Sequence, residues 1–161
     1  MSNFQKFKDT MSFSSHGVSL FSIKPRDNHI LGTTITSFMS VSTEPNCFLF
    51  CLNQKLKVNN HLDVKSLINI HFLNSKQQYI AEIFSNKRDV DAYKDLFTLD
   101  ESNNERLFLK DSIVDIFAQI RSISPIGSHN IYICEVINSD INEYVSCNPL
   151  IYYNRKYTSV K

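Results

Sequence analysis

The sequence predicts a mainly β fold with peripheral helices, and three features of the chain lead to this class. Short segments rich in β-branched and aromatic residues recur along its 161 residues, separated by turn residues. Helical spacing of apolar residues is confined to short stretches between those segments. Hydrophobic residues make up 42% and charged residues 20% of the chain, which is the balance of a protein that folds around a core. Strands with helices inserted between them are typical of a β-barrel with helices at its periphery.

The first half of the chain contains four strand candidates. Residues 1–15 form a loose or helical lead-in, and the apolar-rich residues 18–23 follow as the first strand. Residues 35–41 are rich in β-branched residues, which favours a second strand. The six consecutive apolar residues 47–52 predict a strand buried on both faces. Residues 68–72 alternate between apolar and polar, so we expect a half-buried strand there.

Helical signals appear next. Ser75 and Gln78 fit a capping box, and apolar residues at helical spacing follow them. A largely polar stretch over 85–106 predicts loop plus a short helix, whose buried stripe is Val90, Tyr93, Leu96 and Phe97.

The last third of the chain returns to strands. After an apolar triplet at 107–109 come two long strand candidates, 113–123 and 130–138, which a turn at 125–129 separates. A final strand is predicted at 150–153, and a charged tail follows it.

Charge and glycine content exclude several classes of function. Seventeen basic residues face sixteen acidic ones, so the chain lacks the basic surplus of a nucleic-acid binder. The three glycines, Gly17, Gly32 and Gly127, are far apart, which rules out a Rossmann or Walker A loop. No apolar run is long enough to span a membrane and no apolar leader segment is present. We therefore expect a single domain over 1–161, located in the cytoplasm.

Cysteine and histidine positions give no metal site. No two cysteines form a C-x-x-C pair, so reduced thiols are expected. The histidines are scattered, without a helical pair that could bind zinc: His16, His29, His61, His71 and His129.

The most informative segment is GTTITSFMSVSTEP, residues 32–45, in which hydroxyl side chains interleave with apolar ones. Neutral hydroxyls beside strand backbone can donate hydrogen bonds to a phosphate or to the edge of a heteroaromatic ring. The same residues are also common on strand surfaces, so composition alone leaves both interpretations open.

Read as a motif, this segment resembles the G-M-T-x-S-S-F-x-S-V-S-x-x-P sequence of the short-chain flavin reductases, the reductase components of two-component flavin monooxygenases. Thr36 stands where that family usually has serine, and the matching residues are Gly32, Thr34, Ser37, Phe38, Ser40, Val41, Ser42 and Pro45. The resemblance extends to 47–53, 68–73, 127–129 and the closing tyrosines 153 and 157.

The resemblance implies an FMN-binding split β-barrel that binds FMN or FAD, uses NADH or NADPH as cosubstrate and works as a homodimer. It also implies that reduced flavin passes to a flavin-dependent monooxygenase. The cofactor-binding residues that it implies are Thr34, Thr36, Ser37, Ser40, Cys51, Leu52, Asn53, Lys57, His71, Phe72, Gly127, Ser128, His129 and Tyr157. Hydride transfer takes place between the cofactors, so no acid or base is assigned, and His129 is expected to contact the nicotinamide nucleotide.

Three departures from the family pattern are visible. His71 replaces the usual asparagine, and Ser128 replaces the aspartate of a G-D-H signature. Leu56 and Val58 stand where the family has phosphate-binding Ser and Thr, so the neighbouring Lys55 and Lys57 are the candidates for holding the flavin phosphate.

Two alternatives remain open at this stage. Because of Ser128, the chain could be a flavin-binding protein for electron transfer or storage, without turnover of NAD(P)H. The other is an oxidase of the wider split-barrel group, acting on a substrate such as pyridoxamine phosphate. That reaction would require a set of basic residues around a substrate phosphate, and the sequence shows none.

Overall fold

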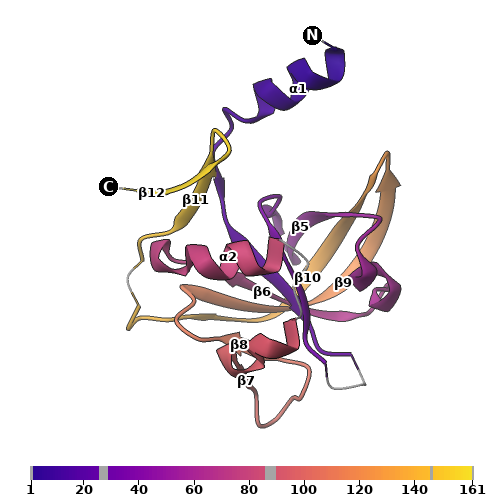
Figure 1. The fold of residues 1–161 in the computed structure, drawn as a ribbon. Coiled ribbons are helices and arrows are strands. Elements are labelled where there is room, and N and C mark those ends of the chain that lie inside the picture. The colour runs from indigo at the N-terminus through magenta and orange to yellow at the C-terminus, as the bar shows by residue number, and fades with distance from the viewer. Residues whose placement is uncertain (1, 26–28, 86–89, 146, 161) are drawn as a thin grey trace.

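The core of the protein is a seven-stranded antiparallel sheet with the strand order β3-β2-β6-β9-β10-β5-β4. The computed structural model describes residues 2–25, 29–85, 90–145 and 147–160. The strands of this sheet are β2 (Ser19–Ile23), β3 (Leu31–Ile35), β4 (Met39–Thr43), β5 (Asn46–Asn53), β6 (Leu67–Phe72), β9 (Val114–Ile126) and β10 (His129–Ile141). The mainly β class with peripheral helices is confirmed (Figure 1).

Smaller elements surround this sheet. The hairpin of β7 (Phe97–Leu99) and β8 (Leu107–Leu109) forms one small sheet, and β1 (His16–Gly17), β11 (Leu150–Tyr153) and β12 (Lys156–Ser159) form another. The helices are α1 (Asn3–Met11), α2 (Gln78–Ser85) and the 3₁₀ turns η1 (Lys57–His61), η2 (Ser75–Gln77) and η3 (Val90–Leu96). Figure 1 shows α1 standing away from the main sheet, beside the β11–β12 hairpin.

Two clusters of buried apolar residues stabilise this arrangement. The main cluster lies on the sheet and contains Phe21, Phe50 and Tyr132, whose rings are almost fully buried. The second cluster packs α2 against β2 and β11 through Leu20, Ile80 and other side chains. Gly32 lies where α2 approaches the sheet, and a Cβ there would come within 2.9 Å of the Phe21 carbonyl oxygen. The close packing of this layer therefore requires glycine.

The segment predicted as one strand over 35–41 is instead two strands at opposite edges of the sheet. β3 ends at Ile35 and β4 begins at Met39, and residues 36–38 connect them. Four residue steps of chain span at most about 14 Å, so the sheet curls until its two edges come close together. The β propensity of this segment was correctly predicted; the break was missed because it depends on the place of β3 and β4 at the two edges of the sheet, which local composition does not show.

Burial along β5 and β6 differs from the expectation. In β5 the side chains alternate: Phe48, Phe50 and Leu52 are buried, whereas the intervening ones are partly exposed. The apolar run was therefore wrongly interpreted as buried on both faces. In β6 the polar side chains Asn69 and His71 are also fully buried, because the 97–112 segment covers that face. The strand predicted for 68–72 is confirmed as β6, but the prediction that it is half-buried is wrong.

Local signals were shifted or missed at two places. The capping box uses Asn74 and Gln77, one residue before the predicted pair, because the η2 turn precedes α2. The predicted charged tail contains β12, which pairs with β11 through a tight turn at Asn154 and Arg155. Both turn residues adopt positive φ, 48° and 61°, as a two-residue hairpin of type I′ requires.

Candidate functional site

Several residues expected to bind a cofactor meet where β5 ends and β10 begins. The antiparallel register places Asn53 opposite His129 and Cys51 opposite Ile131. Gln54, directly after β5, donates its backbone N–H to the carbonyl of Ser128 at 3.0 Å. The two motifs at 51–53 and 127–129, more than seventy residues apart in the chain, are thus one structural unit.

The linker 36–38 also reaches this unit. Ser37 Oγ accepts a hydrogen bond from the Cys51 backbone N–H at 2.9 Å and donates one to the Cys51 carbonyl at 3.2 Å. Phe38 packs against Phe48 and Phe72. One hydroxyl therefore fixes the hydroxyl-rich segment on β5, with the partly buried Thr36 next to it. Burial raises the pKa of the Cys51 thiol, so this side chain is a neutral group and not a thiolate nucleophile.

Basic side chains lie on the loop that follows β5. Lys55 and Lys57 are exposed, whereas Val58 between β5 and β6 is buried in the main core. The Lys55 backbone N–H donates to Asn53 Oδ1 at 3.0 Å. The loop is thus anchored at its base and presents two flexible cations to solvent, beside the Cys51–Asn53 end of β5.

The turn between β9 and β10 consists of Gly127 and Ser128, with His129 as the first residue of β10. Gly127 adopts φ of 56°, which a two-residue hairpin turn requires at its first position. Ser128 Oγ lies 2.9 Å from His129 Nδ1, so the serine fixes the orientation of the exposed imidazole. In the structure the Ser128 hydroxyl is therefore hydrogen-bonded to the side chain of the next residue, His129.

Four other expected residues are placed differently. Thr34 Oγ1 donates to the Ala81 carbonyl of α2 at 2.7 Å, and Tyr157 packs with the second core cluster that contains α2. Burial raises the pKa of the Tyr157 phenol. Ser40 is exposed on edge strand β4 opposite Phe48, and Phe72 is partly buried against the main core.

His71 lies inside the protein. It has no exposed surface, its Nε2 is 2.8 Å from Ser22 Oγ, and its Nδ1 is 2.5 Å from Asp115 Oδ1. A neutral imidazole protonated on Nδ1 satisfies both contacts. Both ring nitrogens are therefore engaged by the protein, and neither is free for a ligand.

Sequence reasoning missed four polar residues around the site: Gln54, Asn59, Asn130 and Tyr132. They are hydrogen-bonded to one another or to the backbone of the two motifs. Asparagine and glutamine after a buried strand are ordinary loop residues, and only the pairing of β5 with β10 brings them together.

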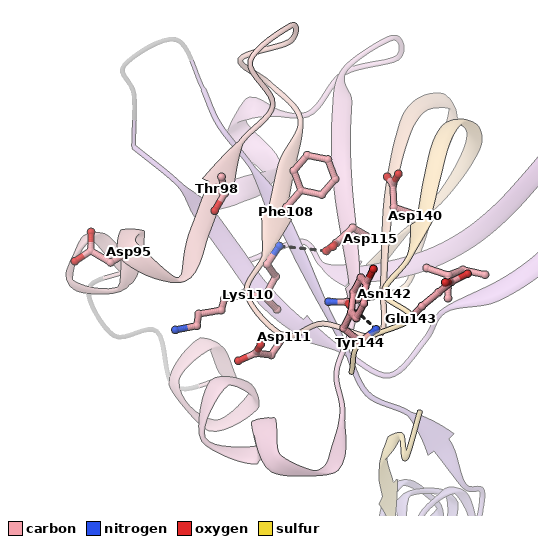
Figure 2. A pocket seen from close by; sticks show the side chains of 12 residues that line it. Asp95, Thr98, Phe108, Lys110, Asp111, Asp115, Asp140, Asn142, Glu143 and Tyr144 are labelled. Carbon is pink, nitrogen blue, oxygen red and sulfur yellow. Dashed lines mark hydrogen bonds between the residues drawn. The ribbon is translucent and has the colours of Figure 1, made fainter. Parts of the chain in front are cut away.

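A separate pocket of about 510 Å³ opens between the β7–β8 hairpin and the outer ends of β9 and β10 (Figure 2). None of its lining residues is among the expected cofactor-binding residues. Lys110 is the one basic residue among the described residues that line the pocket. Five of the lining side chains are carboxylates: Asp95, Asp111, Asp115, Asp140 and Glu143. Such a lining repels phosphate-bearing ligands, so a flavin nucleotide or a nicotinamide nucleotide does not suit this pocket.

The chemistry at the β5–β10 end suits these ligands better. Hydroxyls, backbone groups and two lysines are the donors that hold a phosphate and the polar edge of a planar ring. The described residues in this unit include no carboxylate, so nothing there repels an anion. The fold is that of a small β protein, and the chemistry of this unit suits an anionic, ring-containing ligand.

Comparison with known proteins agrees with this class. Residues 11–161 match the model of the flavin reductase like domain, and the chain belongs to that family. It is 26% identical over 154 residues to the reductase component of the FADH(2)-dependent resorcinol hydroxylase of Rhizobium sp. strain MTP-10005, covering 95% of this chain and 85% of the relative. It is 25% identical to the reductase component of 4-hydroxyphenylacetate 3-monooxygenase of Escherichia coli, covering 96% and 91%. The prediction of a flavin reductase-type oxidoreductase is confirmed at the level of the family.

Solved structures show the same fold. The flavin reductase of styrene monooxygenase from Pseudomonas putida S12 superposes with a TM-score of 0.85 at 19% identity, covering 99% of this chain and 98% of that one. The NADH:FAD oxidoreductase SgcE6 of Streptomyces globisporus, in complex with NAD and FAD fragments, gives a TM-score of 0.86 at 18% identity, covering 99% and 93%. Within the part of the chain that the structure describes, no helix is long and apolar enough to cross a membrane.

Proposed function

We propose that this protein is an NAD(P)H-dependent flavin reductase that binds FMN or FAD at the β5–β10 end of the sheet. The observation that supports this most is the convergence of residues 36–38, 51–53 and 127–129 at one place. Two of these segments are motifs that the flavin reductase family associates with flavin, and the third with the nicotinamide nucleotide. They come from three separate parts of the chain, a linker, the end of a strand and a hairpin turn, and their meeting requires the pairing seen in the structure.

The chain's own residues have simple tasks in this reaction. A bound flavin accepts a hydride from NAD(P)H, so the protein must hold two planar ligands in contact. Ser37 fixes the hydroxyl-rich linker on Cys51, and Thr36 and Asn53 present polar groups beside it. The ammonium groups of Lys55 and Lys57 attract the flavin phosphate.

Residues 127–129 have a matching task toward the nicotinamide nucleotide. The His129 side chain, oriented by Ser128, makes the contact with this nucleotide. No side chain at the site has to transfer a proton, because the hydride moves between the two ligands. Among the expected residues, Thr34 and Tyr157 contribute through α2, and we leave His71 out because both of its nitrogens are engaged.

The proposal is tested by mixing the pure protein with NADH or NADPH and with FMN or FAD, and following the loss of reduced nucleotide. We expect flavin-dependent oxidation of at least one nucleotide. His129→Ala should raise the KM for the nucleotide by about tenfold, the effect of losing one good contact. His61→Ala serves as the control, because His61 is the last residue of η1 and lines a different pocket, together with Ile23 and Glu105. Absence of turnover with every pair would overturn the proposal.

A second candidate is a flavin-binding protein without turnover. One observation favours it: the Ser128 hydroxyl is hydrogen-bonded to His129, within its own turn. If the serine weakens the nucleotide site, Ser128→Asp should create or increase NADH oxidation while flavin affinity stays the same. A wild type that binds flavin, is inert to both nucleotides and gains activity from S128D would favour this candidate.

Two wider proposals concern the partner protein and the location in the cell. We infer that the reduced flavin is passed to a flavin-dependent monooxygenase, because the two relatives described above are named as reductase components of oxygenase systems. We also place the protein in the cytoplasm, which its four free thiols support.

We further propose a homodimer. Met39 is 56% exposed on β4 and pairs across to Leu49, which in turn lies opposite Ile133, so the outer sheet face carries an apolar strip. Phe4 and Phe7 of α1 are also exposed on one helical face. Exposed apolar patches of this kind mark interfaces. Met39→Asp should shift the protein toward monomer in sedimentation velocity, whereas Ile141→Asp, on the pocket shown in Figure 2, should not.

A further inference from the structure

A chain of hydrogen bonds connects the loop that carries the lysines to the turn at 127–129. Gln54 is the first link: its Nε2 donates to Asn130 Oδ1 at 3.1 Å and to the His129 carbonyl at 3.3 Å. Its backbone N–H donates to the Ser128 carbonyl. We call residues 54–57, which carry Lys55 and Lys57, the lysine loop. One residue of this loop therefore contacts three successive residues, from Ser128 of the turn to Asn130 of β10.

Tyr132 and Asn59 form the second link. The Tyr132 hydroxyl donates to Asn59 Oδ1 at 2.6 Å. Asn59 Nδ2 then donates to the carbonyls of Asn53 and Leu56, both at 2.8 Å. The Asn59 amide thus closes the 53–56 turn from inside. Asn130 completes the chain with a long contact from Nδ2 to the Tyr132 hydroxyl, 3.4 Å. We call these four residues, Gln54, Asn59, Asn130 and Tyr132, the polar bridge.

The polar bridge has a rigid base. The Tyr132 ring is 1% exposed and stacks on Phe50, with 5.0 Å between ring centroids and 10° between planes. Burial raises the pKa of the Tyr132 phenol, so the hydroxyl remains a donor at neutral pH. Val58 and Leu62 fix the far end of the loop in the same core. The bridge therefore has a fixed donor at its centre and two surface segments at its ends.

We propose that the polar bridge couples the two ligand sites, so that flavin phosphate bound at the lysine loop and nicotinamide nucleotide bound at 127–129 favour each other's binding. This inference rests on the proposed function. A ligand that orders one end of a hydrogen-bonded chain reduces the ordering that the other end still requires, which produces positive coupling. Gln54, Asn59, Asn130 and Tyr132 act as positioning residues, because they hold the binding segments and not the reacting atoms.

The coupling has an expected size and a dependence on phosphate. Coupling through a small number of hydrogen bonds corresponds to about a fivefold change in affinity. Saturating NAD⁺ should therefore tighten FMN binding by about fivefold, and FMN should tighten NAD⁺ binding by the same factor. Riboflavin lacks the phosphate that the lysine loop attracts, so NAD⁺ should leave its affinity almost unchanged.

The experiment measures the dissociation constants of FMN and riboflavin by flavin fluorescence, with and without NAD⁺, for the wild type and Tyr132→Phe. The substitution keeps the stacked ring and removes only the hydroxyl. We expect Y132F to lose most of the fivefold effect, with raised KM values for both substrates and little change in kcat. Tyr144→Phe is the matched control, because Tyr144 is fully exposed and lines the pocket shown in Figure 2, beyond the end of β10.

A second variant keeps the proposal testable if Y132F fails to fold. Gln54 is exposed, so Gln54→Ala should fold normally and should also reduce the coupling. An active wild type whose FMN affinity does not respond to NAD⁺, or whose response survives in both Y132F and Q54A, overturns this inference alone. A wild type that fails to oxidise either nucleotide in the presence of flavin overturns the proposed function and this inference with it.

Discussion

Two hydrogen-bonded groups of polar side chains in this protein differ in burial, and the difference distinguishes a group sealed in the core from one that reaches the proposed ligand site. The inner group consists of Ser22, His71, Ser112 and Asp115, of which the first three have no exposed surface. The outer group is the polar bridge, whose centre is buried at Tyr132 and whose ends reach the surface at Gln54 and Asn130. Both groups join segments that are distant in the sequence.

The inner group holds the 97–112 segment on the sheet. Asp115 accepts from His71 Nδ1, from Ser112 Oγ at 2.8 Å and from the Leu109 backbone N–H at 3.2 Å. Asn69 adds two contacts to the backbone of the same segment. A ligand cannot reach the His71 ring. The arrangement resembles a Ser-His-Asp triad only in its chain of contacts, because its serine is sealed in the core. Its function is structural.

The largest effect should follow from Asp115→Ala. This change leaves His71 Nδ1 and the Leu109 N–H without their acceptor and removes one of the two acceptors of Ser112 Oγ. Each buried donor left unpaired costs about 1–3 kcal/mol, so we expect a total loss of about 3 kcal/mol. Urea unfolding should show this loss, while the flavin affinity of the folded fraction stays the same. Asp140→Ala is the control, since Asp140 is a half-exposed partner of Arg106 and should cost about 0.5 kcal/mol. Equal losses in the two variants would remove the distinction between inner and outer groups.

The second largest effect should be a loss of folding stability at high pH, caused by the buried Cys134 thiol. Burial raises the pKa of the Cys134 thiol to about 12. Below about pH 8.5 the thiol is protonated in both the folded and unfolded states, and it then has no effect on stability. Above that pH the unfolded chain releases the proton and the folded chain does not, so stability falls by about 1.4 kcal/mol per pH unit until the folded pKa is reached.

Unfolding at about pH 8.5 and about pH 10.5 should therefore differ by roughly 2 kcal/mol from this thiol. Burial also raises the pKa of Tyr132 and Tyr157, which adds to the loss in the same direction. Cys134→Ala should reduce the slope, and Cys147→Ala, at an exposed thiol, should leave it unchanged. A slope that C134A does not alter would show that other groups control the alkaline transition.

What could be predicted from the sequence depends on whether a feature rests on local or on distant contacts. Strands that depend on local pattern were found, among them the long pair at 113–123 and 130–138, now β9 and β10. The turn predicted over 125–129 was also found, because Gly127 marks it, although only Gly127 and Ser128 lie between the two strands. The motifs at 32–45 and 47–53 were predicted to belong to one site, and the structure brings Ser37 and Cys51 into contact.

The features that the sequence did not predict are the burial of polar residues, contacts between distant residues and breaks in strands. They depend on which segments cover or pair with one another in the fold. Asn69 and His71 have the alternation of a half-exposed strand, and only the covering 97–112 segment makes them buried. Tyr132 and Asn59 are 73 residues apart, so no spacing rule connects them. The break at 36–38 has strand-like composition on both sides, and it arises because the chain must pass from one edge of the curled sheet to the other.

The smallest effect should come from Ser37→Ala, and it tests whether the linker belongs to the site or only to the fold. The Ser37 hydroxyl makes two hydrogen bonds to the Cys51 backbone, and their loss costs about 1 kcal/mol. Since the linker then moves more freely over the proposed flavin site, FMN affinity should fall by about fivefold in the same variant. Ser42→Ala in the same segment removes only an exposed contact with the Glu44 N–H and should change neither quantity measurably. A variant S37A that unfolds more easily yet binds FMN as the wild type does would place Ser37 with the inner group, as a structural residue, and would restrict the ligand contacts to the lysine loop and residues 127–129.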